Sequence, residues 1–127
     1  MLLVVVALMF GAAANAAVFY GFSIDVPEGW STDVDEGEYS VTLSSPDGES
    51  MKFKHLSREA MDAYTFALIT SHELNGTSPV EINRFEFEFE LPDEIKARTI
   101  YVESWGILMQ TKDDFENLIA VLNSWVI

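Results

Sequence analysis

The segment 84–91, RFEFEFEL, alternates phenylalanine and glutamate with a strict period of two, and this restricts the fold strongly. Successive side chains of a strand point to opposite faces, so the segment predicts a strand with one apolar and one acidic face. The apolar face must be buried, because its phenylalanines would otherwise lie in water. The chain therefore needs a sheet and a layer that covers at least one side of it.

Further segments have the period or the flanking turn residues of strands, and they fall into two groups. Pro46-Asp47-Gly48 separates two members of the first group, because proline presets φ and glycine accepts a positive φ in a tight turn. The expected strands are 18–26, 38–45 and 50–56 in the first group, and 79–83, 84–91, 97–103 and 107–112 in the second.

Two segments have the period of amphipathic helices. Ser57 is a suitable N-cap for the first helix, which Asn75-Gly76 ends with a glycine suited to a left-handed cap. Thr111 and Asp114 can form a capping box at the start of the second helix. We expect the first helix to bury Ala60, Tyr64, Ala67, Leu68, Ser71 and Leu74, and the second to bury Phe115, Leu118, Ile119, Leu122 and Val126.

The order of these elements predicts an α+β domain. It consists of a mainly antiparallel β-sheet, made of two meanders, packed with two main helices. A chain of 127 residues accommodates one such domain. We expect the domain to cover residues 17–127, since the residues before it have the composition of a targeting segment.

Residues 1–16 have the pattern of a secretory signal peptide. An apolar run from Leu2 to Phe10 is followed by small residues, and Ala14-Asn15-Ala16 has the small-x-small form that predicts cleavage after Ala16. No lysine or arginine precedes the run, which departs from the usual pattern. An uncleaved membrane anchor over 2–22 and an ordinary core strand or helix stay open as alternatives. After cleavage we expect no stable membrane span.

The charge and the absence of cysteine exclude several classes of function. The chain has 21 acidic and 7 basic residues and a net charge of −14, so it repels phosphate and we expect no nucleic acid partner. It has no cysteine, which excludes disulfides, zinc–thiolate sites and thiol nucleophiles. An exported protein without disulfides fits the bacterial periplasm, so we expect a periplasmic or secreted bacterial protein.

Two motifs resemble the PsbP-like superfamily. The first is FSIDVPEGW at 22–30, of the form F-x-I-x-V-P-x-G-W, and the second is the turn SPDG at 45–48. The order of expected elements is similar over residues 19–127. The superfamily, which includes PsbP, DcrB and a Ran-binding import factor, implies an antiparallel sheet sandwiched by helices. Its members are mostly non-catalytic and the matched residues are structural, so the resemblance implies a binding protein and assigns no functional residue.

Trp105 is the strongest candidate for a residue that binds a partner. It lies between Ser104 and Gly106 in an expected hairpin turn, where polar residues are usual. An exposed tryptophan can anchor a partner, and Tyr101 and Glu103 could line a small site beside it. The alternative is that Trp105 folds back on the C-terminal helix.

Asp33, Asp35 and Glu36 are the candidates for a calcium site. They lie in a run of acidic residues over 25–50 that contains no base, and calcium prefers clustered carboxylate oxygens on loops. The segment lacks the loop length and the closing glutamate of a calcium-loop motif. The alternative is a solvated acidic face with no cofactor.

The glutamates at 86, 88 and 90 would repel one another unless bases lie across the sheet. We expect such bases to be Lys52, Lys54 or Arg98, and the alternative is an acidic face that docks a basic partner. The two histidines, His55 and His72, lack the spacing of zinc or metalloprotease motifs, so we expect ordinary packed or surface roles for them.

These observations predict an exported, non-catalytic binding or accessory protein that contacts a protein or an envelope component. A small-ligand or calcium carrier that uses the acidic loops is the first alternative. A hydrolase is the second, and it would need a histidine beside a serine or a carboxylate in a cleft.

Overall fold

The computed structural model describes residues 14–19, 22–102, 105–116 and 118. These residues form nine strands, one α-helix and one short 3₁₀ helix. The strands are β1 (Ala14–Phe19), β2 (Phe22–Pro27), β3 (Ser31–Asp35), β4 (Ser40–Ser44), β5 (Ser50–Ser57), β6 (Val80–Asn83), β7 (Glu86–Glu90), β8 (Lys96–Val102) and β9 (Trp105–Thr111). The helix is α2 (Ala63–Glu73), and the 3₁₀ helix is η1 (Pro92–Glu94).

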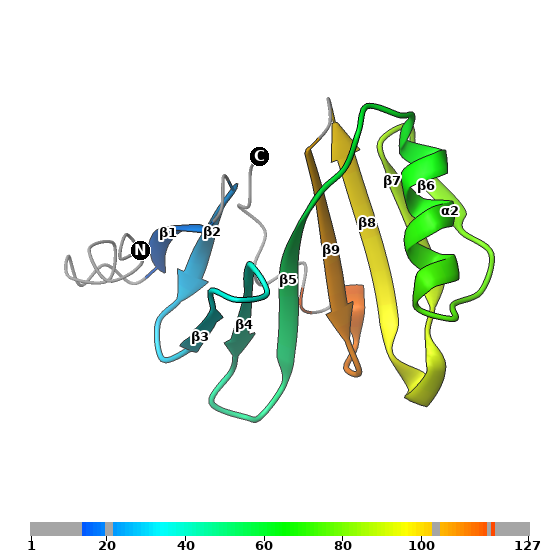
Figure 1. Ribbon diagram of the computed structural model, residues 1–127. Helices are drawn as coiled ribbons and strands as arrows, with labels where there is room; N and C mark the ends of the chain where they lie inside the picture. The colour runs from blue at the N-terminus through cyan, green and yellow to red at the C-terminus, as the bar shows by residue number, and fades with distance from the viewer. Residues whose placement is uncertain (1–13, 20–21, 103–104, 117, 119–127) are drawn as a thin grey trace.

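Seven strands form one antiparallel sheet in the order β3-β4-β5-β9-β8-β7-β6 (Figure 1). The two expected meanders are thus halves of a single sheet, joined where β9 pairs with β5. Four consecutive residues of β9, Gly106 to Met109, are buried. A strand buried on both faces is stable only with neighbours on both sides, and β5 and β8 supply them.

The expectation of two main helices is wrong. The described residues contain a single α-helix, α2, which crosses from β5 to β6 and lies over β7 and β8 (Figure 1). Phe115, Glu116 and Leu118 have helical backbone, and residues 119–127 of the expected second helix lie outside the described residues. In the part of the chain that the structure describes, the domain is therefore a sheet of two joined meanders with one main helix, not a sheet between two helices.

The start and the buried face of α2 also differ from the prediction. Ser57 does not cap the helix but continues β5, where it pairs with Trp105. Asp62 is the N-cap, and its Oδ1 accepts a hydrogen bond from the Thr65 amide at 2.7 Å, which lowers the pKa of the Asp62 carboxyl. The buried residues of the helix are Ala63, Phe66, Ala67, Thr70 and Ser71, whereas Tyr64 and Leu68 are exposed.

The expected strand 18–26 is two strands. β1 and β2 form a separate antiparallel pair, in which Ala16 lies opposite Asp25. Ala16, the expected cleavage point, therefore lies within β1, and the cleavage itself stays a prediction. No helix among the described residues is long and apolar enough to cross a membrane.

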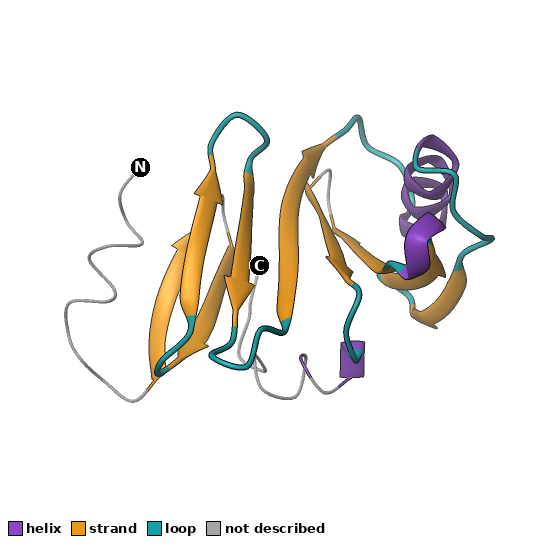
Figure 2. Cartoon of the chain, turned by 90° about the horizontal axis from the view of Figure 1, so that it is seen from below, coloured by secondary structure: helices purple, strands orange, loops and turns teal. Residues whose placement is uncertain are grey.

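The sheet has a core on each face. The main core packs β2 and the segment around Phe115 against one face, which we call the main-core face (Figure 2). Two smaller cores lie under α2 and beside it on the opposite face, which we call the helix face. The main core consists of Ile24, Val26, Val41, Leu43, Met51, Phe53, Ile100, Ile107, Met109, Phe115 and Leu118.

Candidate functional site

The structure does not bring Trp105 and Tyr101 together. Trp105 is the first residue of β9 and packs against the main core, whereas Tyr101 belongs to the core under α2. The two side chains therefore lie on opposite faces of the sheet. Glu103, the third member of the expected site, lies outside the described residues.

Each of the two aromatic side chains is held by its own contacts. Tyr101 is 2% exposed, its ring stacks on Phe66 at 4.4 Å between centroids, and its hydroxyl donates to the Glu59 carbonyl at 2.9 Å. Trp105 is half-buried and its ring lies 5.2 Å from that of His55. Tyr101 has no surface left for a partner, and Trp105 presents only part of its ring.

The acidic residues proposed for calcium are exposed on or beside β3, an edge strand. Asp33 lies opposite Thr42 and Asp35 opposite Ser40, and Asp35 Oδ1 accepts a hydrogen bond from the Glu38 amide at 3.2 Å. The described residues contain no group of three or more acidic or histidine side chains close enough to hold a metal ion. Calcium binding at Asp33, Asp35 and Glu36 stays a prediction without structural support.

Arg98 is the base that lies across the sheet from the glutamates of β7. Its guanidinium is 8% exposed and contacts Glu86 at 3.3 Å, Glu88 at 3.4 Å and Glu116 at 2.6 Å. It also lies 4.4 Å from the centre of the Phe115 ring. Lys52 instead pairs with Glu38 at 2.9 Å, which lowers the pKa of the Glu38 carboxyl. The interpretation of the glutamates as partners of Arg98 is confirmed for two of the three.

The two histidines lie on different elements of the fold. His72 is exposed in the last turn of α2, and His55 is half-buried in β5. Burial disfavours the charged imidazole and so lowers the pKa of His55. The ring lies at 36° to that of Trp105, which is a tilted packing contact.

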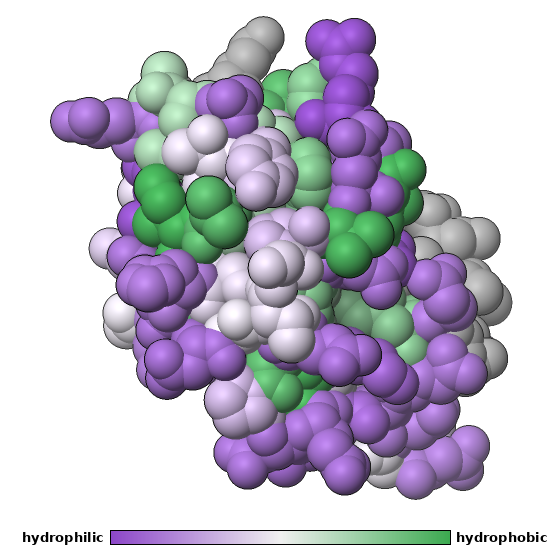
Figure 3. Space-filling model, turned by 90° about the vertical axis from the view of Figure 1, so that its right-hand side faces the viewer, coloured by the Kyte–Doolittle hydropathy of each residue, from purple (hydrophilic) through white to green (hydrophobic). Residues whose placement is uncertain are grey.

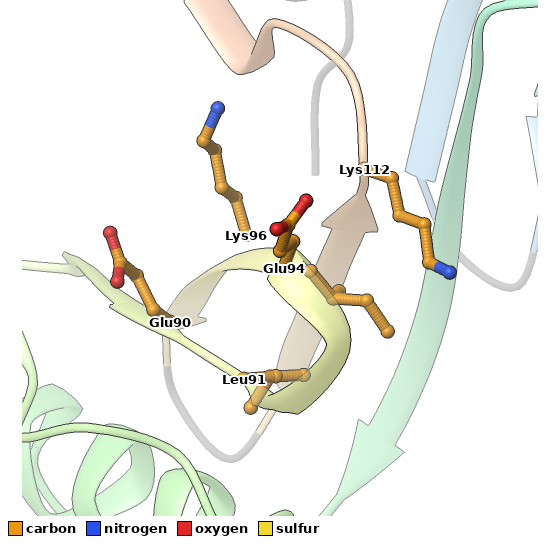
Figure 4. Close-up of a pocket in the computed structure, with 6 residues that line it drawn as sticks. Glu90, Leu91, Glu94, Lys96 and Lys112 are labelled. Atoms are coloured by element: carbon orange, nitrogen blue, oxygen red, sulfur yellow. The ribbon is translucent and has the colours of Figure 1, made fainter.

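A pocket of about 320 Å³ lies around η1, lined by Glu90, Leu91, Glu94, Ile95, Lys96 and Lys112. Figure 4 shows that the ammonium groups of Lys96 and Lys112 point away from each other, with the Glu94 carboxylate between the two side chains. A specific ligand site needs polar groups that converge on one point. The charged groups here diverge, so the pocket gives little support to a ligand site.

Strand β6 is an exposed edge of the sheet, whereas the sequence predicts only that this segment is a strand. It forms one edge of the sheet, and all four of its residues are exposed. Val80 is 63% exposed and Ile82 is 40% exposed, and Phe85 after the strand is also 40% exposed. Val80 and Ile82 were the only sequence signal for this exposed apolar edge. They could not be recognised as exposed, because an apolar residue in a strand normally predicts burial.

Comparisons with protein families, curated proteins and solved structures give no match to this chain. The resemblance to the PsbP-like superfamily therefore rests on the motifs at 22–30 and 45–48 and on the expected order of elements, and no comparison supports it.

Proposed function

We propose that this protein is a non-catalytic binding protein that takes an extended segment of a protein partner as an additional strand along β6. The observation that carries the proposal is the exposed apolar edge. An edge strand has backbone N–H and C=O groups that point away from the sheet, and these can pair with another chain. In accord with the signal-like residues 1–16, we place this activity outside the cytoplasm.

The side chains of β6 support this edge as the docking surface. Edge strands are usually protected by charged side chains, yet Val80 and Ile82 are two of its four residues. In Figure 3, which views the molecule from the right-hand side of Figure 1, apolar side chains reach the surface among hydrophilic ones. The opposite edge, β3, is more polar, since only Val34 among its residues is apolar.

Charge indicates which peptide would bind. Glu81, Glu88 and Glu90 are exposed on and next to β6, and the whole chain carries a net charge of −14. A second copy of this chain would bring like charges together, so pairing of two β6 strands is unfavourable. We therefore propose a partner segment that alternates basic and apolar residues.

The proposal can be tested with the synthetic peptide acetyl-KVKVKVK-amide, labelled for fluorescence anisotropy. We expect saturable binding, and we expect none for the same peptide with alternate backbone nitrogens methylated, because methylation removes the donors that pair with the edge. The double variant Val80→Ser/Ile82→Ser should bind the peptide about tenfold more weakly, from loss of two partly exposed apolar contacts.

Val34→Ser in β3 is the matched control, because Val34 is a 38% exposed apolar residue of the other edge strand. It should bind the peptide as the unaltered protein does. Equal binding of the methylated peptide would show that only charge attracts the peptide, and it would refute strand addition. Equal loss in the Val34→Ser variant would refute the assignment to β6.

A further inference from the structure

A strand added along β6 would have two faces, and the register of β6 shows what each face meets. Val80 pairs with Glu88 and Glu81 pairs with Phe87, and residues directly opposite each other share a face of the sheet. Phe87 belongs to the core under α2, so Glu81 lies on the helix face and Val80 lies on the main-core face. The added strand therefore meets Glu81 on one face and Val80 on the other.

Helix α2 carries a tyrosine on its flank nearer to β6. Phe66 stacks on Tyr101 of β8, whereas the centre of the Tyr64 ring lies 5.6 Å from that of Phe87 in β7. Because the strands run in the order β8-β7-β6, the flank of the helix with Tyr64 is the one nearer to the edge (Figure 1). Tyr64 is 49% exposed, so part of its ring is accessible to a partner.

Glu81 supplies an acidic group on the same face. It is exposed, and it has no ion pair within 4 Å in the part of the chain that the structure describes. Phe87 connects it with Tyr64, since Phe87 lies directly opposite Glu81 and in contact with the tyrosine ring. A carboxylate and an aromatic ring thus flank one phenylalanine beside the open edge, and both groups attract a cation.

The main-core face of the same edge is less suited to a base. Glu86 and Glu88 contact Arg98 there at 3.3 and 3.4 Å, so their charges are already offset. Val80, which lies opposite Glu88, is 63% exposed and offers an apolar contact. The charges therefore favour basic residues of the added strand on the helix face and apolar residues on the main-core face.

The other charged groups near the start of α2 do not cancel the charge of Glu81. Arg84 lies in the turn after β6, and its guanidinium is 4.6 Å from the centre of the Phe85 ring. Arg84 and Asp62 line the same pocket of about 440 Å³, so a base and an acid lie together at this end of the helix. Glu81 leaves the local charge negative.

We propose that Tyr64 and Glu81 form a subsite that selects arginine in the strand added along β6. The guanidinium lies on the Tyr64 ring and pairs with the Glu81 carboxylate, while the apolar residues of the same strand lie beside Val80. Arginine is preferred to lysine, because its planar group stacks on an aromatic ring and still donates hydrogen bonds to a carboxylate. This inference rests on the strand addition proposed above, and it adds the identity and the direction of the basic side chain.

The test compares acetyl-RVRVRVR-amide with acetyl-KVKVKVK-amide by fluorescence anisotropy on the full chain. The arginine peptide should bind about fivefold more tightly than the lysine peptide. Tyr64→Leu keeps an apolar side chain but removes the ring, so it should reduce the affinity for the arginine peptide to that for the lysine peptide. Tyr64→Phe should keep the preference, because the ring remains. The melting temperatures of both variants show whether they are folded.

A second variant tests the carboxylate. Glu81→Gln should weaken the binding of both peptides about threefold, since it removes an exposed ion pair from each complex. Glu28→Gln is the matched control, because Glu28 is an exposed glutamate after β2 and the substitution changes the net charge by the same amount. It should leave both affinities close to those of the unaltered protein.

The outcomes distinguish this inference from the proposed function. If neither peptide binds, strand addition is refuted and the arginine subsite with it. If the lysine peptide binds and methylation of its backbone abolishes binding, strand addition holds. Equal affinity for the two peptides, or a preference that persists in Tyr64→Leu, would then overturn the arginine subsite alone. Equal weakening by Glu28→Gln and Glu81→Gln would refute the role of Glu81.

Discussion

Arg98 links three acidic side chains from two parts of the chain to the main-core face of the sheet. Glu86 and Glu88 come from β7, and Glu116 comes from the segment after β9. The guanidinium presents a planar fork of donors that can serve several carboxylates at once, and its face can lie on an aromatic ring such as Phe115. A single buried base thus allows an acidic strand face to lie at the edge of the main core.

We predict that Arg98→Ala lowers the free energy of unfolding by about 2 kcal/mol, because Glu86 is left half-buried without its partner and the exposed acids contribute little. Arg98→Lys should recover part of this loss, since an ammonium cannot contact the three carboxylates in the same geometry. Urea unfolding followed by circular dichroism measures both values. Arg84→Ala, at an exposed arginine, is the control and should change stability by less than about 0.5 kcal/mol. A similar loss in both alanine variants would contradict the role of Arg98.

The sequence predicted the role of Arg98 better than that of Trp105. Alternation within 84–91 is a local pattern that put the glutamates on one strand face and offered Lys52, Lys54 and Arg98 as their partners, and the structure shows that Arg98 is the one that faces them. The environment of Trp105 depends on β5, which is distant along the chain, so neither its half-burial nor its contact with His55 could be derived. The φ of 54° at Tyr39 has no signature in sequence, since tyrosine does not predict a positive φ.

At the scale of elements, a glycine allows α2 to lie close to the sheet. Gly106 of β9 pairs with Tyr101, and a Cβ at this position would lie 2.4 Å from the Phe66 ring of α2. Phe66 is fully buried and stacks on Tyr101. The helix and the two strands therefore meet at a point where only glycine leaves space for the phenylalanine.

We predict that Gly106→Ala destabilises the protein by about 2 kcal/mol through overpacking against Phe66. The double variant Gly106→Ala/Phe66→Leu should be more stable than the sum of the single effects predicts, because the smaller side chain relieves the clash. Chemical denaturation of the four proteins gives the coupling energy. Gly37→Ala, where a Cβ would have only an ordinary contact at 3.5 Å, is the control. If the changes in unfolding free energy of the two single variants simply add, the clash is relieved by movement of other residues and not by the smaller side chain at position 66.

Most strands could be predicted from the sequence, but the boundaries of α2 and β5 could not. The period of two in 50–56 and in 84–91 reports burial on one face, which is a local property. Ser57 and Asp62 are both good caps by residue type, and the choice between them depends on whether Ser57 can pair with Trp105. The buried face of the helix was misassigned for another reason, because it is set by packing on distant strands, where Phe66 stacks on Tyr101 of β8.

At the scale of the whole molecule, the chain has a net charge of −14, and in the part that the structure describes no three acidic or histidine side chains gather closely enough to hold a metal ion. We predict that the melting temperature rises as NaCl is increased to about 1 M, which shortens the Debye length to about 3 Å and screens the repulsion among the acids. Calcium and magnesium chlorides at matched ionic strength should give equal increases, since Asp33, Asp35 and Glu36 are exposed and lie along an edge strand. A rise specific to calcium would instead support the carrier alternative and would place its site at these residues.

The pairing of β9 between β5 and β8 has a consequence for the newly made chain. β9 is the last strand among the described residues but occupies the middle of the sheet, so a ribosome releases both of its neighbours before it releases the strand that joins them. Until residues 105–111 have emerged, β5 and β8 each present an open edge, and open edges promote aggregation. A chain that ends before residue 105 would therefore lack the strand that joins the two halves of the sheet, and we expect it to aggregate rather than to form a smaller stable protein.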